Sequence, residues 1–265
     1  MMNVTELTGL WTRSLMAWPD GRRDTTTNVA WMQGISAYAD LRQPPELAGR
    51  FRHATCLRDL TLADCLLLAT QQAFAGTFVP VGEHFEWQRH IDFQPPRETR
   101  DIGQLYWQGD ILIEAGLQGE YIEHWHRDPA LPATPCAALI LQGERDGRWG
   151  QLLRVGNLFM FARDRQQPAL GKTMAACVTA APSLLAAQDA IDFEISFGQI
   201  SPEGWRITRS TLPFRQDSWL RHKMTGPNVL IDDVAPDGGA FVRSWKITVT
   251  EGDTSVFIDA NRETL

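Results

Sequence analysis

The stretch FEWQRHIDFQPPR, residues 85–97, returns later in the chain as GWRITRSTLPFR, residues 204–215. The two stretches align without a gap when Trp87 lies on Trp205 and Pro95 on Pro213, an offset of 118 residues. A repeat of this kind indicates that one structural unit occurs twice in the chain.

Three further pairs of segments follow the same order at offsets between 118 and 123 residues, which indicates a tandem duplication. They are YADLRQPP (38–45) with FARDRQQP (161–168), FAGTF (74–78) with FEISF (193–197), and GEYIEHWHR (119–127) with GAFVRSWKI (239–247). Between the copies lies DPALPATP (128–135), whose three prolines disfavour a helix or a central strand. We therefore predict two domains, residues 1–133 and 134–265.

Each unit reads as a series of short strands. Runs rich in β-branched and aromatic residues alternate with Gly, Asp and Pro turns, and only residues 57–74 and 174–191 have room for helical turns. About 130 antiparallel residues suit a small closed barrel. The predicted fold class is all-β, a tandem duplication of two antiparallel β-barrels, with one continuous sandwich of repeated halves as the alternative.

Several of these segments resemble a known family. GLW (9–11) resembles the G-x-W motif that opens the first strand of lipocalins, and WQRHIDFQPP, YADLRQP and YIEHWHR resemble the two-barrel, lipocalin-like proteins of bacteria and fungi, which include a fungal kinase-interacting protein. The resemblance implies two lipocalin-like barrels, the first closed at one end by Trp11 against Arg127. It implies no activity and no cofactor.

Composition restricts the classes of function. The chain has 265 residues, is 43% hydrophobic, contains ten tryptophans and carries a formal net charge of −7, which argues against partners such as nucleic acid or an anionic membrane surface. No apolar run is long enough for a membrane span, and the start of the chain lacks a basic leader. Four scattered cysteines suggest free thiols. We expect a cytoplasmic protein, and we leave a homodimer open.

The faces of the strands follow from their alternation. In GEYIEHWHRD (119–128) Tyr121, Glu123 and Trp125 share one face, and His124 and His126 share the other. The aromatic face is expected to point inward because it recurs in the second copy, so the two histidines point outward. An H-x-H pair on an outer face lacks a closed set of ligands, and no metal is predicted.

Charged residues on the inward faces are the candidate polar anchors of a binding site. Arg89 and Glu123 each interrupt an apolar face, and a buried charge requires a partner or a wet cavity. Either the two form a structural ion pair, or they anchor a ligand in a pocket walled by aromatic residues, which taken alone are also explained as core. These aromatic residues are Trp11, Trp31, Tyr38, Trp87, Tyr121 and Trp125.

The second copy replaces this pattern with arginines. Arg243 stands where the first copy has Glu123, and Arg209 lies on the predicted inner face of the second barrel. Two unpaired arginines in a cavity would face solvent or hold an anion. A pocket in the second barrel is therefore predicted to be open to water or to bind an anion.

Three functions are compatible with these features. The first is a lipocalin-like binding protein whose partner is a small apolar or aromatic ligand in a barrel cavity, because the sequence contains no P-loop, nucleophile elbow or dinucleotide fingerprint. The second is a cofactor-free isomerase, cyclase or lyase with Glu123 as acid or base beside Arg89. The third is a protein-interaction module that uses the outer faces.

Overall fold

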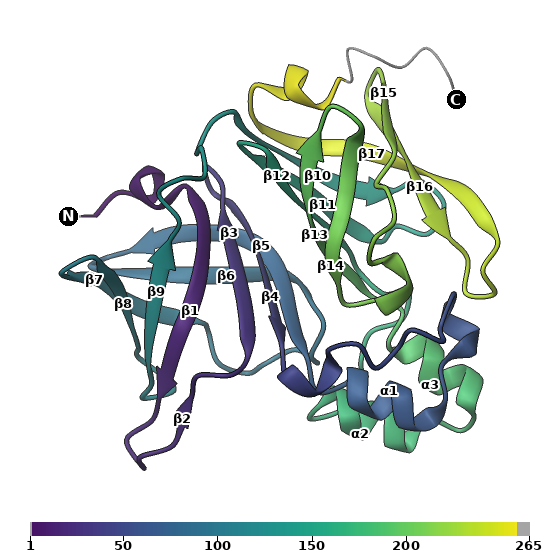
Figure 1. Cartoon of the computed structure of the whole chain (residues 1–265), viewed down its shortest axis with the longest axis horizontal. Helices are drawn as coiled ribbons and strands as arrows, with labels where there is room; N and C mark the ends of the chain where they lie inside the picture. The colour runs from purple at the N-terminus through teal and green to yellow at the C-terminus, as the bar shows by residue number, and fades with distance from the viewer. Residues whose placement is uncertain (1, 259–265) are drawn as a thin grey trace.

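The computed structural model describes residues 2–258, and its architecture is two β-sheets in tandem, each curled on itself (Figure 1). The first sheet contains β1 (Gly9–Ala17), β2 (Arg23–Asp24), β3 (Asn28–Gln33), β4 (Ala37–Gln43), β5 (Gln72–Val81), β6 (His84–Asp92), β7 (Ile102–Gln108), β8 (Ile111–Gly116) and β9 (Ile122–Arg127). The second contains β10 (Cys136–Gly143), β11 (Trp149–Val155), β12 (Leu158–Arg163), β13 (Glu194–Ser201), β14 (Gly204–Ser210), β15 (His222–Thr225), β16 (Asn228–Val234) and β17 (Ala240–Gly252).

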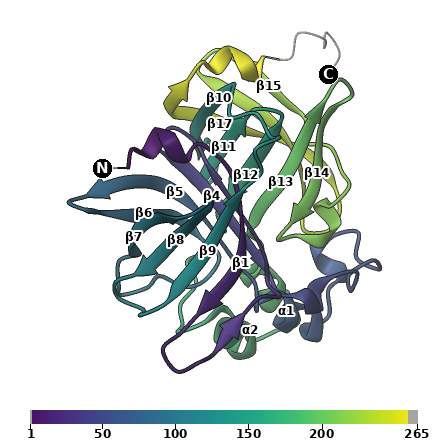
Figure 2. The same cartoon turned by 60° about the vertical axis from the view of Figure 1, so that its left-hand side comes forward.

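The first sheet closes into a barrel. Strand β1 pairs with β3 on one side and with β9 on the other, so the antiparallel order returns to its start; Figure 2 shows β9 beside β1. Every strand of this ring thus has a neighbour on both sides, although β6 and β7 pair only at Phe85–Gly103 and Glu86–Ile102. The predicted fold of two tandem barrels is confirmed.

The second sheet has the same order of strands but remains open. Its terminal strands β14 and β15 do not pair with each other; an isolated bridge joins Arg206 of β14 to Trp219, which precedes β15. The sheet therefore forms a half-barrel. The proline-rich joint lies between the end of β9 and the start of β10, and the four cysteines are free thiols.

Short helices occur where the sequence predicts helical turns. They are α1 (Leu62–Leu68), α2 (Met174–Ala180) and α3 (Leu184–Ala190). Thr61, Thr173 and Ser183 cap them, each accepting a hydrogen bond from a backbone N–H three residues ahead. The three helices contact one another beneath the second sheet, as Figure 1 shows. Helices from both copies thus complete one layer.

A hydrophobic core is shared by the two sheets. Met32, Leu41 and Phe93 of the first sheet belong to the same buried cluster as Leu153 and Phe193 of the second, and the α1–α3 helices pack against it. We call this cluster the shared core. Each sheet also has its own interior cluster. The copies are therefore packed against each other through apolar surface.

One of the four repeat alignments is shifted by one residue. The match of FAGTF with FEISF places Phe74 on Phe193, but Asp40 pairs with Phe74 in the first sheet and Arg163 pairs with Glu194 in the second. Phe74 lies inside the first barrel, whereas Phe193 lies in the shared core. Since successive side chains alternate in a strand, the interior counterpart of Phe74 is Glu194.

Candidate functional site

Aromatic rings fill the half of the first barrel that lies beneath the N-terminal segment. Trp31 stacks on Trp11 at a centroid separation of 5.7 Å and meets Trp125 edge-on at 5.4 Å and Trp87 at 5.8 Å. Tyr38, on the neighbouring strand, is fully buried in the same cluster. These rings contact one another, so they form the core of the barrel rather than the wall of an apolar cavity.

The end of the barrel next to this core is closed by Trp11 and Arg127. The indole Nε1 of Trp11 donates to the carbonyl of Leu7 at 2.7 Å, and the guanidinium of Arg127 lies 5.4 Å from the Trp11 ring centroid. Arg127 also donates to the carbonyl of Glu6 at 3.0 Å. The predicted contact between Trp11 and Arg127 is confirmed, and it attaches the first and last strands to the N-terminal turn.

The opposite end of the same barrel contains a layer of buried charge. Glu123 is fully buried and accepts from Arg13 at 2.5 Å and from Arg42 at 3.0 Å. Arg13 also reaches Asp24 at 2.6 Å, and Arg42 forms a two-pronged contact with Asp40 at 2.9 and 3.0 Å. The suggested ion pair between Glu123 and Arg89 is wrong, because Arg13 and Arg42 occupy the carboxylate.

Arg89 belongs to a second group in this layer. Its guanidinium contacts Asp101 at 2.5 Å and Asp92 at 3.1 Å, and it lies over the ring of Phe74 at 3.4 Å from the centroid. Two carboxylates and an aromatic face hold the planar group in one orientation. Arg89 is inside the barrel, as its strand face predicts.

Glu114 is the residue with the least usual environment. Its side chain is 3% exposed, its Oε2 accepts from the indole of Trp125 at 3.0 Å, and its Oε1 lies 2.8 Å from the Tyr121 hydroxyl. Burial raises the pKa of Glu114 well above its ordinary value of 4.5, and the negative charge of Glu123 adds to the rise. Glu114 therefore keeps its proton far above the pH at which an exposed glutamate ionises.

A pocket of about 220 Å³ lies against this charged layer, and we call it the mouth pocket. Strand β1 locates this pocket relative to the aromatic core. Trp11, near the start of β1, pairs with Arg127 at one end of the barrel, and Met16, near the end of β1, pairs with Glu123 at the other. The side chains that line it and bear on its chemistry are Arg13, Asp24, Arg42, Arg89, Asp101 and Tyr121.

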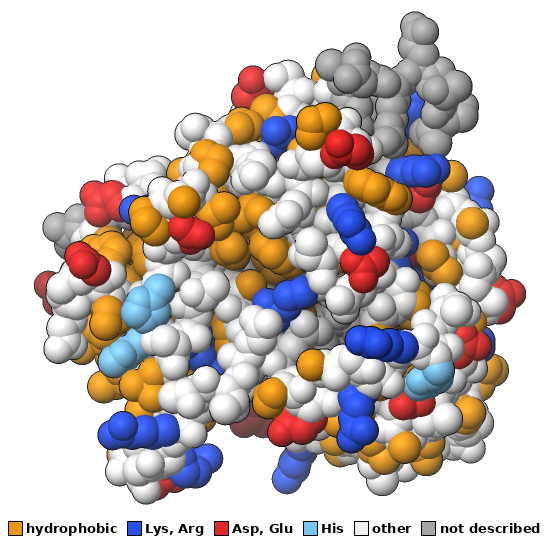
Figure 3. All heavy atoms as spheres, in the orientation of Figure 1, with side chains coloured by type: hydrophobic (Ala, Val, Ile, Leu, Met, Phe, Trp, Pro, Cys, Tyr) orange, Lys and Arg blue, Asp and Glu red, His pale blue; other side chains and the backbone are white. Residues whose placement is uncertain are grey.

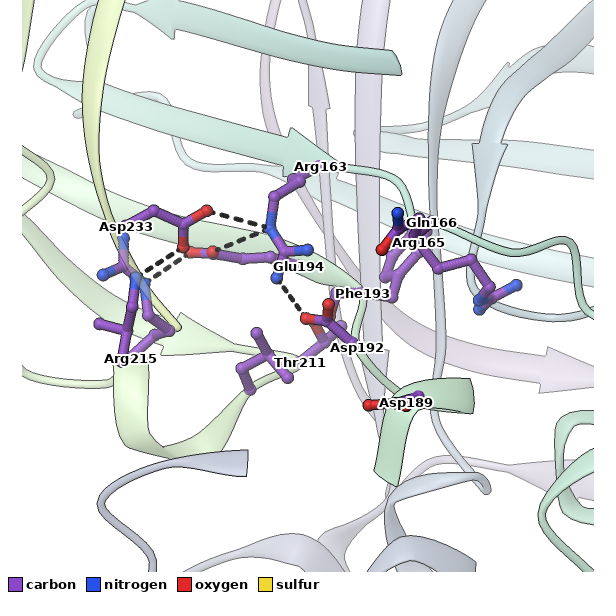
Figure 4. Close-up of polar contacts among 12 residues, drawn as sticks. Arg163, Arg165, Gln166, Asp189, Asp192, Phe193, Glu194, Thr211, Arg215 and Asp233 are labelled. Carbon is purple, nitrogen blue, oxygen red and sulfur yellow. Dashed lines mark hydrogen bonds and ion pairs between the residues drawn. The ribbon is translucent and has the colours of Figure 1, made fainter. Parts of the chain in front are cut away.

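The second sheet has its own buried ionic cluster, shown in Figure 4. Arg163 contacts Asp192 at 2.7 Å, Asp233 at 3.7 Å and Glu194 at 3.9 Å, and Arg215 contacts Glu194 at 3.0 Å. All of these carboxylates lie on strands or turns that face the interior of the half-barrel. The positive charges of the arginines in this cluster are therefore paired with the negative charges of its carboxylates.

Arg243 and Arg209 do not form the unpaired couple that the sequence predicts. Arg243 contacts Asp233 at 2.8 Å and Asp146 at 2.6 Å. Arg209 donates instead to Asn28 of the first sheet at 2.9 Å, because the pairing of β13 with β14 shifts between Phe197 and Gly198. That irregularity exchanges the two faces of β14, so Arg209 points toward the first barrel. The prediction of two unpaired arginines inside the second barrel is therefore wrong.

The copies carry opposite charges at two equivalent interior positions. Asp40 of β4 corresponds to Arg163 of β12 in strand order and repeat offset, and Glu123 of β9 corresponds to Arg243 of β17. Each residue has partners of the opposite sign within its own copy. The duplicated position thus keeps a charge and changes its sign.

The outer face of β9 carries the two histidines, as predicted. His124 and His126 alternate with the buried Glu123 and Trp125, and His126 Nε2 lies 2.7 Å from the Ser14 hydroxyl. Histidine side chains are visible on the surface of the first barrel in Figure 3. Within residues 2–258, no group of three or more His, Cys, Asp or Glu is arranged to hold a metal ion.

Several residues of the charged layer were not predicted from the sequence. Arg13, Arg42, Asp40 and Asp101 lie on segments whose inward faces were not assigned. Glu114 had a detectable signal, because it alternates with the buried Leu112 in ILIEAG on an otherwise apolar face. The residue that sits beside Tyr121 could thus have been found by the alternation that identified Glu123.

Comparisons with known proteins inform the fold. No family model and no curated protein matches the chain. Among solved structures it is similar to the crystal structure of the uncharacterized protein YLR301w from Saccharomyces cerevisiae, with a TM-score of 0.52 and 11% identity over 92% of this chain and 98% of the yeast chain. At this identity the likeness shows the fold alone. In residues 2–258 no helix has the length and hydropathy of a membrane span.

Proposed function

We propose that the protein binds a small carbonyl or carboxylate compound in the mouth pocket, where the hydroxyl of Tyr121 donates to its oxygen. The arrangement of Glu114 and Tyr121 carries this proposal. In the structure Oε2 of Glu114 accepts from Trp125 and Oε1 accepts from the Tyr121 hydroxyl at 2.8 Å. We propose that a proton on Oε1 of the neutral acid reverses the second contact and bonds to the Tyr121 oxygen. This reversal would free the hydrogen of Tyr121, whose other acceptor in the protein is Asp101 Oδ1 at 3.5 Å.

A contact of 3.5 Å is long for an O–H···O hydrogen bond, whose usual range is about 2.5–3.0 Å. Tyr121 therefore has donor capacity for a guest oxygen in the pocket that it lines. The pocket, at about 220 Å³, is smaller than the roughly 300–1,000 Å³ typical of sites for drug-sized molecules. Arg13, Arg42 and Arg89 already hold carboxylates, and Arg97, which also lines the pocket, forms no ion pair within residues 2–258, so the guest is small and carries at most one negative charge.

Binding of butyrate and 2-butanone, observed by saturation-transfer NMR, tests this proposal. We expect the Tyr121→Phe variant to bind the probes about tenfold more weakly, because the substitution removes one donor and keeps the ring. Tyr106→Phe is the matched control, since Tyr106 is exposed on β7. Equal affinities for the wild type and Tyr121→Phe would contradict the proposal, as would the absence of binding by either probe.

A cofactor-free enzyme is the second candidate, and the raised pKa of Glu114 favours it. A protonated carboxylic acid behind a tyrosine hydroxyl can stabilise negative charge that develops on a carbonyl oxygen. Glu114 takes the acid role that the sequence suggested for Glu123, because two arginines hold Glu123. The test is deuterium incorporation from D₂O next to the carbonyl of 2-butanone, in which solvent takes the α-proton as the C–H bond breaks and then returns a deuteron to the enolate. Exchange that is equally fast in Glu114→Gln and wild type would exclude this role.

A further inference from the structure

The second candidate site lies outside both barrels. A groove of about 590 Å³ separates the two copies; β6 and residues 94–101 form one wall, and residues 146–149 with 164–169 form the other. We propose that this groove binds a flat organic carboxylate, held at its charged end by Arg165 and along its body by Trp149. The groove shares Arg89, Arg97 and Asp101 with the mouth pocket, but Arg165 and Trp149 line the groove and not the mouth pocket.

Arg165 is a buried cation whose hydrogen-bond acceptors are neutral backbone carbonyls. Its side chain is 7% exposed; Nη1 and Nη2 donate to the backbone carbonyls of Asp92 and Phe93. Its Nε is buried without a hydrogen-bond partner. The guanidinium lies over the rings of Phe193 at 5.2 Å and Phe93 at 5.6 Å. Figure 4 shows it directed away from the ionic cluster of the second sheet.

Three of the other arginines of the groove pair with carboxylates, and the fourth, Arg97, is exposed and donates to Gln72 at 3.4 Å. Arg89, Arg100 and Arg148 each contact a carboxylate at 3.1 Å or less, whereas no carboxylate of residues 2–258 forms an ion pair with Arg165. The nearby Asp164 uses its Oδ1 to accept from the backbone N–H of Arg165 at 2.7 Å. An unpaired buried cation is costly, and a carboxylate ligand supplies the missing charge and acceptor.

Burial has a measurable consequence for this side chain. It lowers the pKa of the Arg165 guanidinium, and the negative charges of Asp164 and Asp92 offset the loss of water only in part. The geometry of the groove and the missing acceptor already point to an anion. The direction of the pKa shift agrees with them.

Trp149 gives the groove a flat apolar surface. It begins β11 and is 45% exposed, although tryptophan is a large apolar residue that usually packs inside. Pro96 and Pro168 are among the other apolar residues that line the groove. An aromatic body can stack on an exposed indole, while a carboxylate reaches Arg165. The volume of about 590 Å³ falls in the range that accommodates such a molecule.

The probes for this proposal are 2-naphthoate and its neutral counterpart 2-naphthamide, titrated into the full chain by calorimetry. We expect 2-naphthoate to bind more tightly than 2-naphthamide, because only the acid pairs with Arg165. Arg165→Met and Trp149→Ala should each weaken 2-naphthoate by about tenfold or more. Arg206→Met and Trp219→Ala are the matched controls, because both side chains are exposed and neither lines the groove.

Trp149→Ala keeps the test valid if Arg165→Met fails to fold, because Trp149 is an exposed side chain whose loss leaves the core intact. Unchanged affinity of 2-naphthoate in Trp149→Ala would overturn the groove proposal, as would failure of 2-naphthoate to bind the wild type. A loss confined to Tyr121→Phe would also overturn it and would assign the probe to the mouth pocket. The two proposals therefore fail separately.

Discussion

At the scale of single residues, Glu114 illustrates how a barrel interior changes the chemistry of a carboxyl group. Its neighbours on β9 and at the start of β7 are Trp125, Tyr121, Glu123 and Asp101, with Arg42 opposite. Two of these groups donate hydrogen bonds, two carry negative charge and one carries positive charge. Burial dominates the balance and raises the pKa of Glu114, so the neutral acid persists to a higher pH than in an exposed glutamate.

Glu114→Gln should remove a pH dependence of stability. The unfolded chain releases the proton near the ordinary pKa of 4.5, whereas the folded protein holds it to a higher pH. The free energy of unfolding of the wild type therefore falls as pH rises between these values, by up to about 1.4 kcal/mol per pH unit relative to the variant. Urea unfolding from pH 4 to 8 measures the difference. A constant difference over this range would mean that Glu114 is ionised in the folded protein.

Arg163→Met should destabilise the protein strongly. The substitution leaves Asp192, Glu194 and Asp233 with one cation fewer in a buried cluster, and the loss of one partner from such a cluster typically costs about 3–5 kcal/mol. Arg206→Met is the control, because Arg206 pairs with Asp217 in solvent and its loss should change stability by about 0.5 kcal/mol or less. Equal midpoints of chemical unfolding for the two variants would contradict the structure of the cluster.

At the scale of elements, the alternation of side chains along the strands predicts the two barrels, but it does not predict the side-chain faces that follow a bulge. The inward face of β6 is correct for Trp87 and Arg89, which precede a register shift between β5 and β6, whereas Ile91, which follows the shift, lies in the shared core. Arg209 was assigned by the same rule and points elsewhere, because the register of β13 and β14 shifts two residues earlier. Alternation in the sequence predicts which side chains point inward only where the pairing between neighbouring strands is regular. Fold class was therefore predictable, and the second barrel's interior charge was not.

The repeat makes a paired prediction about Trp87 and Trp205. Trp87 packs on Phe78 at 4.8 Å, and Trp205 packs on Phe159 at 5.0 Å, each inside its own sheet. Because both rings are nearly fully buried, Trp87→Ala and Trp205→Ala should each destabilise by about 3–5 kcal/mol. Thermal unfolding of the two variants checks this. If one variant unfolds like the wild type, the two tryptophans are not equivalent.

At the scale of the whole molecule, the shared core joins the copies into one packed body. Side-chain amides add to it, since Gln151 donates to the carbonyl of Tyr38 at 2.8 Å and Gln71 donates to the carbonyl of Thr211 at 3.0 Å. These buried donors are satisfied only across the boundary between copies. The division of the chain into residues 1–133 and 134–265 stays a prediction, and the interface implies that each part stabilises the other.

Leu153→Ala should therefore weaken both sheets together. Leu153 lies on β11 in the shared core, and its truncation should cost about 2–5 kcal/mol. Hydrogen exchange of β3–β4 amides should accelerate as much as that of β11–β12 amides, because the two copies unfold in one transition. Leu139→Ala, inside the second sheet, is the matched control for burial. Protection lost in the second sheet alone would show that the copies unfold separately.

The reversal of charge between equivalent positions also bears on how a duplicated chain assembles. Two similar units on one polypeptide risk exchanging strands while they form. If β17 took the place of β9 beside β1, Arg243 would enter the position of Glu123, next to Arg13 and Arg42 and without a carboxylate between them. Like charges in that buried layer would repel. The opposite charges therefore favour pairing of each strand within its own copy, and the barrel with an exchanged strand is the less stable product.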